Sequence, residues 1–251
     1  MSGHNKWASI KHKKAATDAK KGKVFTKIIR EIVIAAKEGG GQIESNARLR
    51  KSVEDAKAAN MPQDNIKKAI QRGTGEIPGI VYEELNYEGY GPAGVALIVE
   101  TTTDNKNRTA SEIRKIFSSH GGNLGETGCV GWMFERKGYI TIDKSAGDEE
   151  TLMNLVLEVG ADDFTNNADS DVYEVIVASA DLEKIKKALK DKNINILSAE
   201  ISMLPQTYIR LTGDDAAKMV KLMDSLEEHD DVKNVFANFD ISADEMEKLN
   251  G

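Results

Sequence analysis

Residues 139–204 read YITIDKSAGDEETLMNLVLEVGADDFTNNADSDVYEVIVASADLEKIKKALKDKNINILSAEISML. Short apolar runs typical of strands alternate here with longer runs in which apolar residues recur at helical spacing. The predicted strands are Tyr139–Asp143, Asp163–Asn166, Val172–Ala178 and Ile196–Leu204. The predicted helices are Glu149–Val159 and Leu182–Lys192. The chain order of these elements is therefore β-α-β-β-α-β.

This order is that of a ferredoxin-like unit, and a strand, a helix and a strand are predicted on either side of it. The flanking elements are Gly94–Thr102, Asn107–His120, Cys129–Phe134, Thr207–Leu211, Asp214–Glu228 and Val232–Phe239. Together the two flanks make a second ferredoxin-like unit, with the middle unit inserted between its second and third strands. Two units in tandem are the alternative, but they would leave a half-sheet with unpaired edges at each end.

The residues before these units are predicted to form a small helical bundle. A helix from Thr17 to Lys37 has one apolar face with a period near 3.6 residues. Ser45 can cap a second helix, and Pro62 can open a third that Gly73 ends. The residues before Thr17 show no periodicity and are expected to form a mobile tail.

The sequence thus predicts a multi-domain protein of the α and α+β classes. Residues 1–78 form a basic helical domain with its N-terminal tail. Residues 79–136 and 206–251 form a discontinuous ferredoxin-like α+β domain, and residues 137–205 form a ferredoxin-like α+β domain inserted in it.

Basic residues crowd the start of a chain that is acidic overall. Nine of the first 30 residues are Lys or Arg and one is acidic, whereas the whole chain has a formal net charge of −7. Residues 1–72 carry a net charge of +10 and the remaining residues carry −17. Such dense cations repel one another in an isolated fold, whereas each phosphate of a polyanion that they neutralise releases a counterion. We therefore expect the N-terminal region to bind nucleic acid.

The residues predicted to bind nucleic acid are Lys6, Trp7, Lys11, His12, Lys13, Lys14, Lys20, Lys21, Lys23, Lys27 and Arg30. Lysine binds phosphate as a point charge, whereas bidentate base reading favours Arg, Asn and Gln. The lysine bias therefore favours backbone contacts with little sequence specificity. Trp7 can stack on a base or fill a pocket in a partner, and docking on its own bundle is the alternative.

A second candidate site lies at Asp104-Asn105-Lys106-Asn107-Arg108-Thr109, where a strand gives way to a helix. Asp104 or Asn105 is expected to cap this helix by accepting hydrogen bonds from its first free amides. Lys106 and Arg108, beside those amides, can in addition hold a phosphate or an acidic protein segment.

The chain lacks the residue patterns of common enzyme classes. No two histidines have the i, i+4 spacing of a helical metal site, and no nucleophile elbow, Walker A or dinucleotide-binding pattern occurs. Cys129 is the single cysteine, and its apolar neighbours predict a buried, inert thiol. Acidic pairs such as Asp230-Asp231 are interpreted as helix caps or turns. We therefore predict no catalysis, no metal, no cofactor and no small-molecule substrate.

The hydropathy of the sequence bears on the cellular location of the protein. No apolar run approaches the ~20 residues that cross a bilayer, and the start lacks the apolar core of a signal peptide. The sequence therefore predicts a cytoplasmic protein with no membrane partner.

Three motifs resemble those of one known family. They are Gly3-His4-Asn5-Lys6-Trp7 with Ile10-Lys11-His12-Lys13-Lys14, then Thr101-Thr102-Thr103-Asp104-Asn105-Lys106-Asn107-Arg108-Thr109, then Gly121-Gly122-Asn123-Leu124-Gly125 with Gly128-Cys129-Val130-Gly131-Trp132-Met133-Phe134. In this order they resemble the YebC family, which also includes the mitochondrial translational activator of cytochrome oxidase. The resemblance spans essentially the whole chain and implies a helical N-terminal domain followed by two α+β domains around a cleft. It also implies control of gene expression. Members of the family are usually labelled DNA-binding transcriptional regulators, whereas the mitochondrial relatives are described as translation factors that act on the ribosome.

The sequence therefore predicts a non-enzymatic regulator whose basic head binds nucleic acid through phosphate contacts. DNA-binding transcriptional regulation is the first form of this prediction. The alternative is a ribosome-associated translation factor that contacts ribosomal RNA through the head. A further alternative is a protein-interaction scaffold that uses the cleft and needs no nucleic acid.

Overall fold

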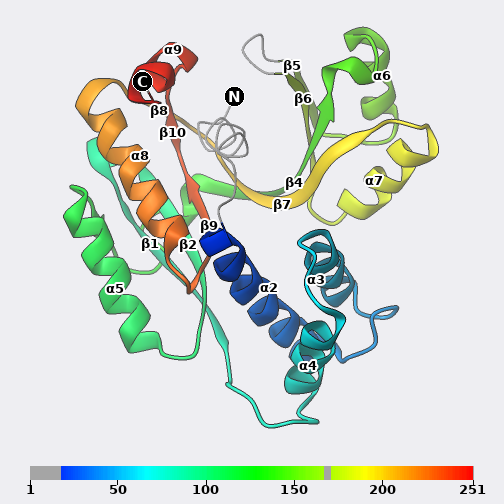
Figure 1. Cartoon of the computed structure of the whole chain (residues 1–251). Helices are drawn as coiled ribbons and strands as arrows, with labels where there is room; N and C mark the ends of the chain where they lie inside the picture. The colour runs from blue at the N-terminus through cyan, green and yellow to red at the C-terminus, as the bar shows by residue number, and fades with distance from the viewer. Residues whose placement is uncertain (1–17, 167–170, 251) are drawn as a thin grey trace. The chain divides into compact units, whose positions relative to one another are not determined.

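The computed structural model describes residues 18–166 and 171–250, with side chains for 22–166 and 171–249 (Figure 1). The described chain forms two compact units. The first unit holds residues 18–130 and 213–235, and the second holds residues 131–212 and 236–250. None of the described helices combines the length and the apolar character that crossing a membrane requires.

The first unit begins with three helices that pack through their apolar faces. They are α2 (Asp18–Gly39), α3 (Ala47–Ala58) and α4 (Gln63–Thr74). Their common core includes Ile32, Leu49 and Ile66, which are almost completely buried. All three helices were predicted from the spacing of apolar residues.

The start of α3 differs by one residue from the prediction, because Asn46 and not Ser45 caps it. The Asn46 side-chain oxygen accepts a hydrogen bond from the Leu49 amide at 3.0 Å. Its side-chain nitrogen donates to the carbonyl oxygens of Ala35 at 2.7 Å and Gly40 at 2.8 Å. The buried Asn46 therefore joins the end of α2 to the start of α3.

Gly73 was predicted to end α4, but it does not. The helix continues to Thr74 and ends at Gly75, which has a left-handed φ of +80°. A Cβ at Gly73 would lie 2.4 Å from the carbonyl oxygen of Val33 in α2. Gly73 therefore permits the close approach of two helices, and Gly75 permits the turn.

The first unit continues with a four-stranded sheet and two helices. Its strands are β1 (Glu83–Tyr90), β2 (Ala96–Thr103), β3 (Asn123–Leu124) and β9 (Val232–Ala237), in the order β3-β1-β2-β9. A short 3-10 helix (Pro92–Gly94) joins β1 to β2. Helices α5 (Lys106–Ser119) and α8 (Gly213–Glu228) lie side by side on one face of the sheet (Figure 1). Phe117 of α5 and Leu222 of α8 are completely buried.

The strand predicted at Cys129–Phe134 is wrong. Turns and a 3-10 helix (Gly131–Met133) occupy this stretch, and a strand begins only at its last residue. The Glu88 carboxylate accepts hydrogen bonds from the amides of Gly128 at 2.9 Å and Val130 at 2.8 Å. These amides therefore pair with a side chain instead of with a neighbouring strand.

The flanking elements also combine differently from the prediction. Strand β1 was missed, because its sequence EELNYEGY holds three acidic residues and no apolar run. Of the strand predicted at Thr207–Leu211, only β8 (Ile209–Arg210) forms, and it pairs in parallel with β10 (Phe239–Asp240) instead of joining the sheet of the first unit. The mixed α+β class is observed, while the nested domain boundaries stay a prediction.

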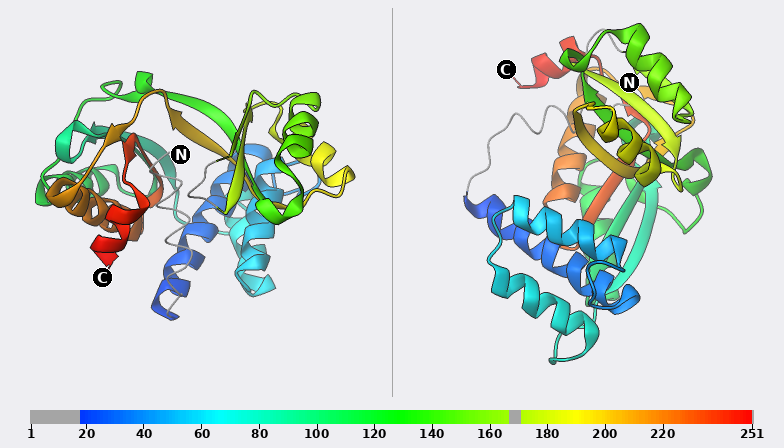
Figure 2. Two further views of the ribbon diagram at one scale, coloured as in Figure 1. Left: turned by 90° about the horizontal axis from the view of Figure 1, so that it is seen from above. Right: turned by 90° about the vertical axis from the view of Figure 1, so that its right-hand side faces the viewer.

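The second unit contains all six elements predicted for residues 139–204. They are β4 (Phe134–Asp143), α6 (Glu149–Glu158), β5 (Asp163–Asn166), β6 (Val172–Ala178), α7 (Leu182–Asp191) and β7 (Ile196–Pro205). The strands form an antiparallel sheet in the order β5-β6-β4-β7, with both helices on one face (Figure 2). The core between sheet and helices includes Ile140, Leu152 and Ile185. A 3-10 helix (Lys144–Ala146) and α9 (Ala243–Asn250) complete the described chain.

Candidate functional site

Basic side chains of α2 contact the last two residues of α8 and the three residues that follow, which we call together the α8–β9 turn (residues 227–231). Lys23 Nζ donates to the carbonyl oxygen of Glu228 at 3.0 Å, and Lys27 Nζ donates to that of Glu227 at 2.7 Å. The last carbonyls of a helix have no partner within it and carry its negative partial charge. The end of α8 is therefore a natural acceptor for the lysines of α2.

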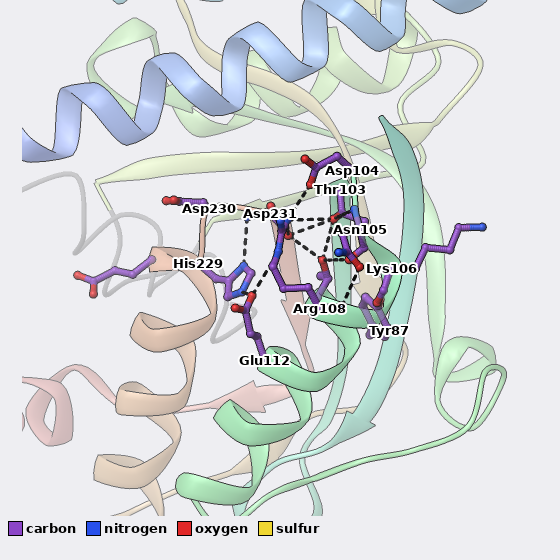
Figure 3. A network of polar contacts seen from close by, with 12 residues as sticks. Tyr87, Thr103, Asp104, Asn105, Lys106, Arg108, Glu112, His229, Asp230 and Asp231 are labelled. Carbon is purple, nitrogen blue, oxygen red and sulfur yellow. Dashed lines mark hydrogen bonds and ion pairs between the residues drawn. The ribbon is translucent and has the colours of Figure 1, made fainter. Parts of the chain in front are cut away.

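Asp231 is the centre of this region (Figure 3). Its side chain is 3% exposed, and its Oδ1 accepts a hydrogen bond from Arg30 of α2 at 2.7 Å. Its Oδ2 lies 2.7 Å from Arg108 Nη2 and 2.7 Å from the Thr109 hydroxyl, both in α5. The hydroxyl of Thr103, at the end of β2, lies 3.1 Å from the same oxygen. One buried carboxylate thus joins α2, α5, β2 and β9.

The surroundings of Asp231 keep it ionised. Burial by itself would raise its pKa, but the hydrogen bonds from Thr109 and Arg108 and the positive charges of Arg30 and Arg108 lower it to about 2. A buried charge is tolerated when it is paired and fully hydrogen-bonded. Asp231 meets both conditions.

The second predicted site, at the start of α5, is built around contacts within the chain. Asn105 caps α5, because its side-chain oxygen accepts a hydrogen bond from the Arg108 amide at 3.1 Å. The Arg108 guanidinium contacts the carboxylates of Asp231 and, at 2.9 Å, Asp104. Hydrogen bonds to these two carboxylates raise the pKa of Arg108. Lys106 instead pairs with Glu83 of β1 at 2.6 Å, so the two cations of this motif have different partners.

His229 lies beside Asp231 and contacts Glu112 of α5. Its Nε2 lies 2.9 Å from Glu112 Oε2, and its Nδ1 accepts a hydrogen bond from the Asp231 amide at 3.1 Å. The neutral ring must therefore carry its proton on Nε2, which donates to Glu112.

Potential ligand atoms of Glu112, His229 and Asp231 lie within 4.8 Å of one another. A metal ion needs the lone pair of a ring nitrogen, whereas His229 presents an N–H there and its other nitrogen is already an acceptor. The Asp231 carboxylate is also engaged with two arginines. These residues therefore do not fit a metal ion.

The same side chains line an open cavity of about 460 Å³ in the first unit. Its lining consists of Lys23, Arg30, Arg108, His229 and five acidic residues, which are Asp104, Glu112, Glu228, Asp230 and Asp231. Cavities that bind small organic ligands are mostly apolar. This cavity is instead a charged surface depression.

Family models match nearly the whole chain. A model described as the TACO1/YebC protein N-terminal domain matches residues 5–76. A model described as the TACO1/YebC second and third domain matches residues 82–239. The chain belongs to the TACO1/YebC family.

Relatives of this TACO1/YebC chain are similar over their full length. A protein of Endomicrobium trichonymphae, named probable transcriptional regulatory protein, is 76% identical, and the match covers 100% of both chains. A protein of the same name from Pelotomaculum thermopropionicum is 56% identical, over 96% of this chain and 99% of the relative. The crystal structure of a conserved hypothetical protein from Aquifex aeolicus has a TM-score of 0.83 at 46% identity, covering 94% of this chain and 97% of that one.

A second group of ion pairs fixes α2 of this TACO1/YebC chain from another side. Arg48 of α3 contacts Glu31 of α2 at 2.7 Å and Glu84 of β1 at 2.5 Å. Lys233 of β9 contacts Glu31 at 2.9 Å. Burial by itself would raise the pKa of Glu31, but its contacts with Arg48 and Lys233 lower it. The polar faces of α2 therefore contact α3, β9 and the α8–β9 turn, and Arg48 links them further to β1.

The predicted nucleic-acid-binding residues divide into three groups. Six lie outside the described residues, and they are Lys6, Trp7, Lys11, His12, Lys13 and Lys14. Lys20 and Lys21 lie in α2, where the backbone is described. Lys23, Lys27 and Arg30 contact the α8–β9 turn. The structure thus brings together Arg30 and Arg108, which the sequence assigned to separate sites.

Sequence reasoning missed the central residue of this network. Asp231 was interpreted with Asp230 as a cap or a turn, and no periodicity or motif distinguishes it. The sequence offers one indication, which is that Asp231 directly precedes a predicted strand. A carboxylate at the start of a strand can be buried if a positively charged side chain packs against it. Which cation lies opposite depends on α2 and α5, far away in the sequence.

Proposed function

We propose that this chain is a non-enzymatic regulator of gene expression that binds the backbone of a nucleic acid through its lysine-rich N-terminal region. The observation that carries the proposal is the presence of nine basic residues and one acidic residue among the first 30, in a chain with a net charge of −7. The name of the relatives, probable transcriptional regulatory protein, supports control of gene expression.

Two of the predicted contacts are already used inside the protein. Arg30 is 13% exposed and paired with Asp231, and Lys27 is half-buried at the end of α8. Lys23 is exposed, although it also contacts α8. The proposal therefore gives Arg30 and Lys27 no main phosphate contact and keeps Lys6, Lys11, Lys13, Lys14, Lys20 and Lys21, with Lys23 at their edge.

DNA is the first candidate for the polymer, because the relatives are named as transcriptional regulators. Ribosomal RNA is the alternative, and the lysine bias favours it over sequence-specific DNA reading, since lysine grips phosphate without reading bases. With either polymer, the proposed function is exerted in the cytoplasm. A scaffold role without nucleic acid is the third candidate, for which the acidic remainder of the chain, with net charge −17, is the motivating feature.

The test is a charge-reversal variant with Lys11→Glu, Lys13→Glu and Lys14→Glu. We expect it to lose binding to a DNA duplex or to isolated ribosomes, measured by gel shift and by cosedimentation at rising salt concentrations. Each lost phosphate contact should lower the salt slope by about 0.9 on duplex DNA.

The matched control reverses three exposed lysines of α7, with Lys184→Glu, Lys187→Glu and Lys190→Glu. It changes the net charge equally and should keep the affinity of the wild type. If wild type and the control are retained on ribosomes and the Lys11, Lys13 and Lys14 variant is not, the protein is the translation factor. Tight binding to one duplex sequence without ribosome retention selects the transcriptional regulator. Equal binding by both variants would contradict nucleic-acid binding through the N-terminal region and favour the scaffold.

A further inference from the structure

We propose that Asp231 is a positioning residue for nucleic-acid binding, because it anchors the basic helix α2 in one fixed direction. This inference rests on the proposed function. It adds Asp231, which is acidic and buried, to the residues on which nucleic-acid binding depends. The binding region would then depend on a carboxylate that never touches the nucleic acid.

The contacts of Asp231 support an anchor and not a ligand. Its carboxylate is 3% exposed and accepts hydrogen bonds from Arg30 of α2 and Arg108 of α5. Arg30 Nη1 also donates to the carbonyl oxygens of Asp230 at 2.6 Å and Thr102 at 3.3 Å. Three oxygen atoms from β2 and the α8–β9 turn therefore surround Nη1 of Arg30.

The anchor continues along α2 toward the proposed phosphate contacts. Lys27 and Lys23 lie one and two turns before Arg30, and both donate to carbonyl oxygens of the α8–β9 turn. Lys20 and Lys21 belong to the same continuous helix. At about 1.5 Å per residue, they lie within roughly 15 Å of Arg30 along the helix axis. Fixing Arg30 therefore fixes the line on which these lysines lie.

A fixed array of cations binds a polyanion better than a movable one, because less conformational freedom is lost on binding. Loss of the anchor should weaken binding even though no phosphate contact is removed. Loss of an acidic residue as such should strengthen binding, because it reduces repulsion of the phosphates. The two effects have opposite signs, so one substitution distinguishes them.

Asp230 provides the matched control. It is the neighbour of Asp231 in the sequence and is exposed, and among the described residues no hydrogen bond or ion pair involves its side chain. Asp230→Asn and Asp231→Asn change the net charge equally and at almost the same place. The Asp230 carbonyl that accepts from Arg30 is kept in both variants.

The experiment measures the affinity of both variants for a DNA duplex and for isolated ribosomes over a series of salt concentrations. We expect Asp231→Asn to bind roughly three- to tenfold more weakly than wild type, with the same salt slope, because the same cations remain. Asp230→Asn should bind as tightly as wild type or slightly more tightly. Circular dichroism at the assay temperature shows whether each variant is folded. A folded Asp231→Asn protein that binds at least as tightly as Asp230→Asn would overturn the proposal.

Arg30→Gln and Arg30→Lys test the same anchor from the side of α2 and apply also if Asp231→Asn does not fold. We expect Arg30→Gln to weaken binding without changing the salt slope, and Arg30→Lys to recover part of the affinity. A salt slope lowered by about 0.9 in Arg30→Gln would make Arg30 a phosphate ligand and overturn the proposal. An unchanged affinity in Arg30→Gln would overturn it as well.

Failure of this inference differs from failure of the proposed function. If the Lys11, Lys13 and Lys14 reversal leaves binding intact, the N-terminal region is not the binding surface. If that reversal abolishes binding while the variants at Asp231 and Arg30 bind like wild type, the binding region stands and only the anchor is wrong.

Discussion

At the scale of single residues, the chemistry of Asp231 depends on its neighbours and not on its own type. Asp230 and Asp231 are adjacent and identical, yet the first is exposed and the second is 3% exposed between two arginines. The charge of Arg30 is used in the same contact, so it is not free for a phosphate. A count of basic residues therefore overstates the number of cations that a partner can reach.

The lowered pKa of Asp231 predicts a specific loss of stability in acid. Its native pKa of about 2 lies below the ordinary value of 3.8, so the unfolded state takes up the proton first as the pH falls. The contribution of Asp231 to the free energy of unfolding, about 2 kcal/mol, is complete above the ordinary value and is lost as the pH falls from there through about 2. Urea unfolding of wild type and Asp231→Asn across this range checks the prediction. It would be contradicted if the two proteins lost stability in parallel.

At the scale of elements, helix α2 is held by polar contacts on several sides as well as by its apolar face. Arg30 and two lysines attach it to the α8–β9 turn, and Glu31 attaches it to Arg48 and Lys233. Apolar spacing predicted one buried face for α2, and Ile32, Val33 and Ala36 on that face are buried, whereas Val24 at its start is exposed. The basic residues opposite that face were assigned to a partner, whereas three of them contact β2, the end of α8 and the α8–β9 turn.

The cap of α3 can be tested by a pair of neighbouring substitutions. Asn46→Ala removes the cap and leaves the carbonyls of Ala35 and Gly40 without their donor, so we expect the free energy of unfolding to fall by roughly 1–3 kcal/mol. Ser45→Ala, at an exposed residue that was the predicted cap, should change it by less than about 0.5 kcal/mol. Urea unfolding of both variants measures the difference, and equal effects would mean that Asn46 is not the cap.

The close packing of α4 on α2 gives a second prediction at this scale. Gly73→Ala would place its Cβ 2.4 Å from the Val33 carbonyl oxygen, and we expect a cost of roughly 1–3 kcal/mol. A Cβ added at Gly22 in α2 meets no other described side chain within 4 Å, so Gly22→Ala should stabilise the protein by up to about 1 kcal/mol. Thermal unfolding compares the two, and a stabilising Gly73→Ala would contradict the close approach.

At the scale of the whole molecule, charge is divided along the chain. Residues 1–72 carry +10, and the remainder carries −17. An acidic remainder repels a phosphate backbone, so under the proposed function we expect contact only through the N-terminal region and binding that depends strongly on salt. The salt series proposed above for the lysine reversal therefore tests the whole charge distribution as well as three side chains.

Local patterns in the sequence predicted most helices and strands of this protein. The six elements of residues 139–204 and the three helices before residue 75 follow from apolar spacing, because the spacing decides which face of an element can be buried. Strand β1 was missed because its side chains lack that pattern. The strand predicted at Cys129–Phe134 was wrong because Glu88 binds the amides at its start, those of Gly128 and Val130, and a 3-10 helix follows. These predictions failed where the backbone conformation depends on a side chain distant in the sequence or on pairing with a neighbouring strand.

The sequence by itself determined the charge division, most of the elements and the family to which the chain belongs. Only the tertiary structure decided which charges are used within the protein. Arg30 lies 201 positions from Asp231 and Arg108 lies 123 positions from it, so no local pattern links them. A buried carboxylate is stable only where the fold brings positive charge and hydrogen-bond donors to its oxygens. The packing of α2, α5 and β9 provides those partners for Asp231, and it leaves Asp230 in solvent.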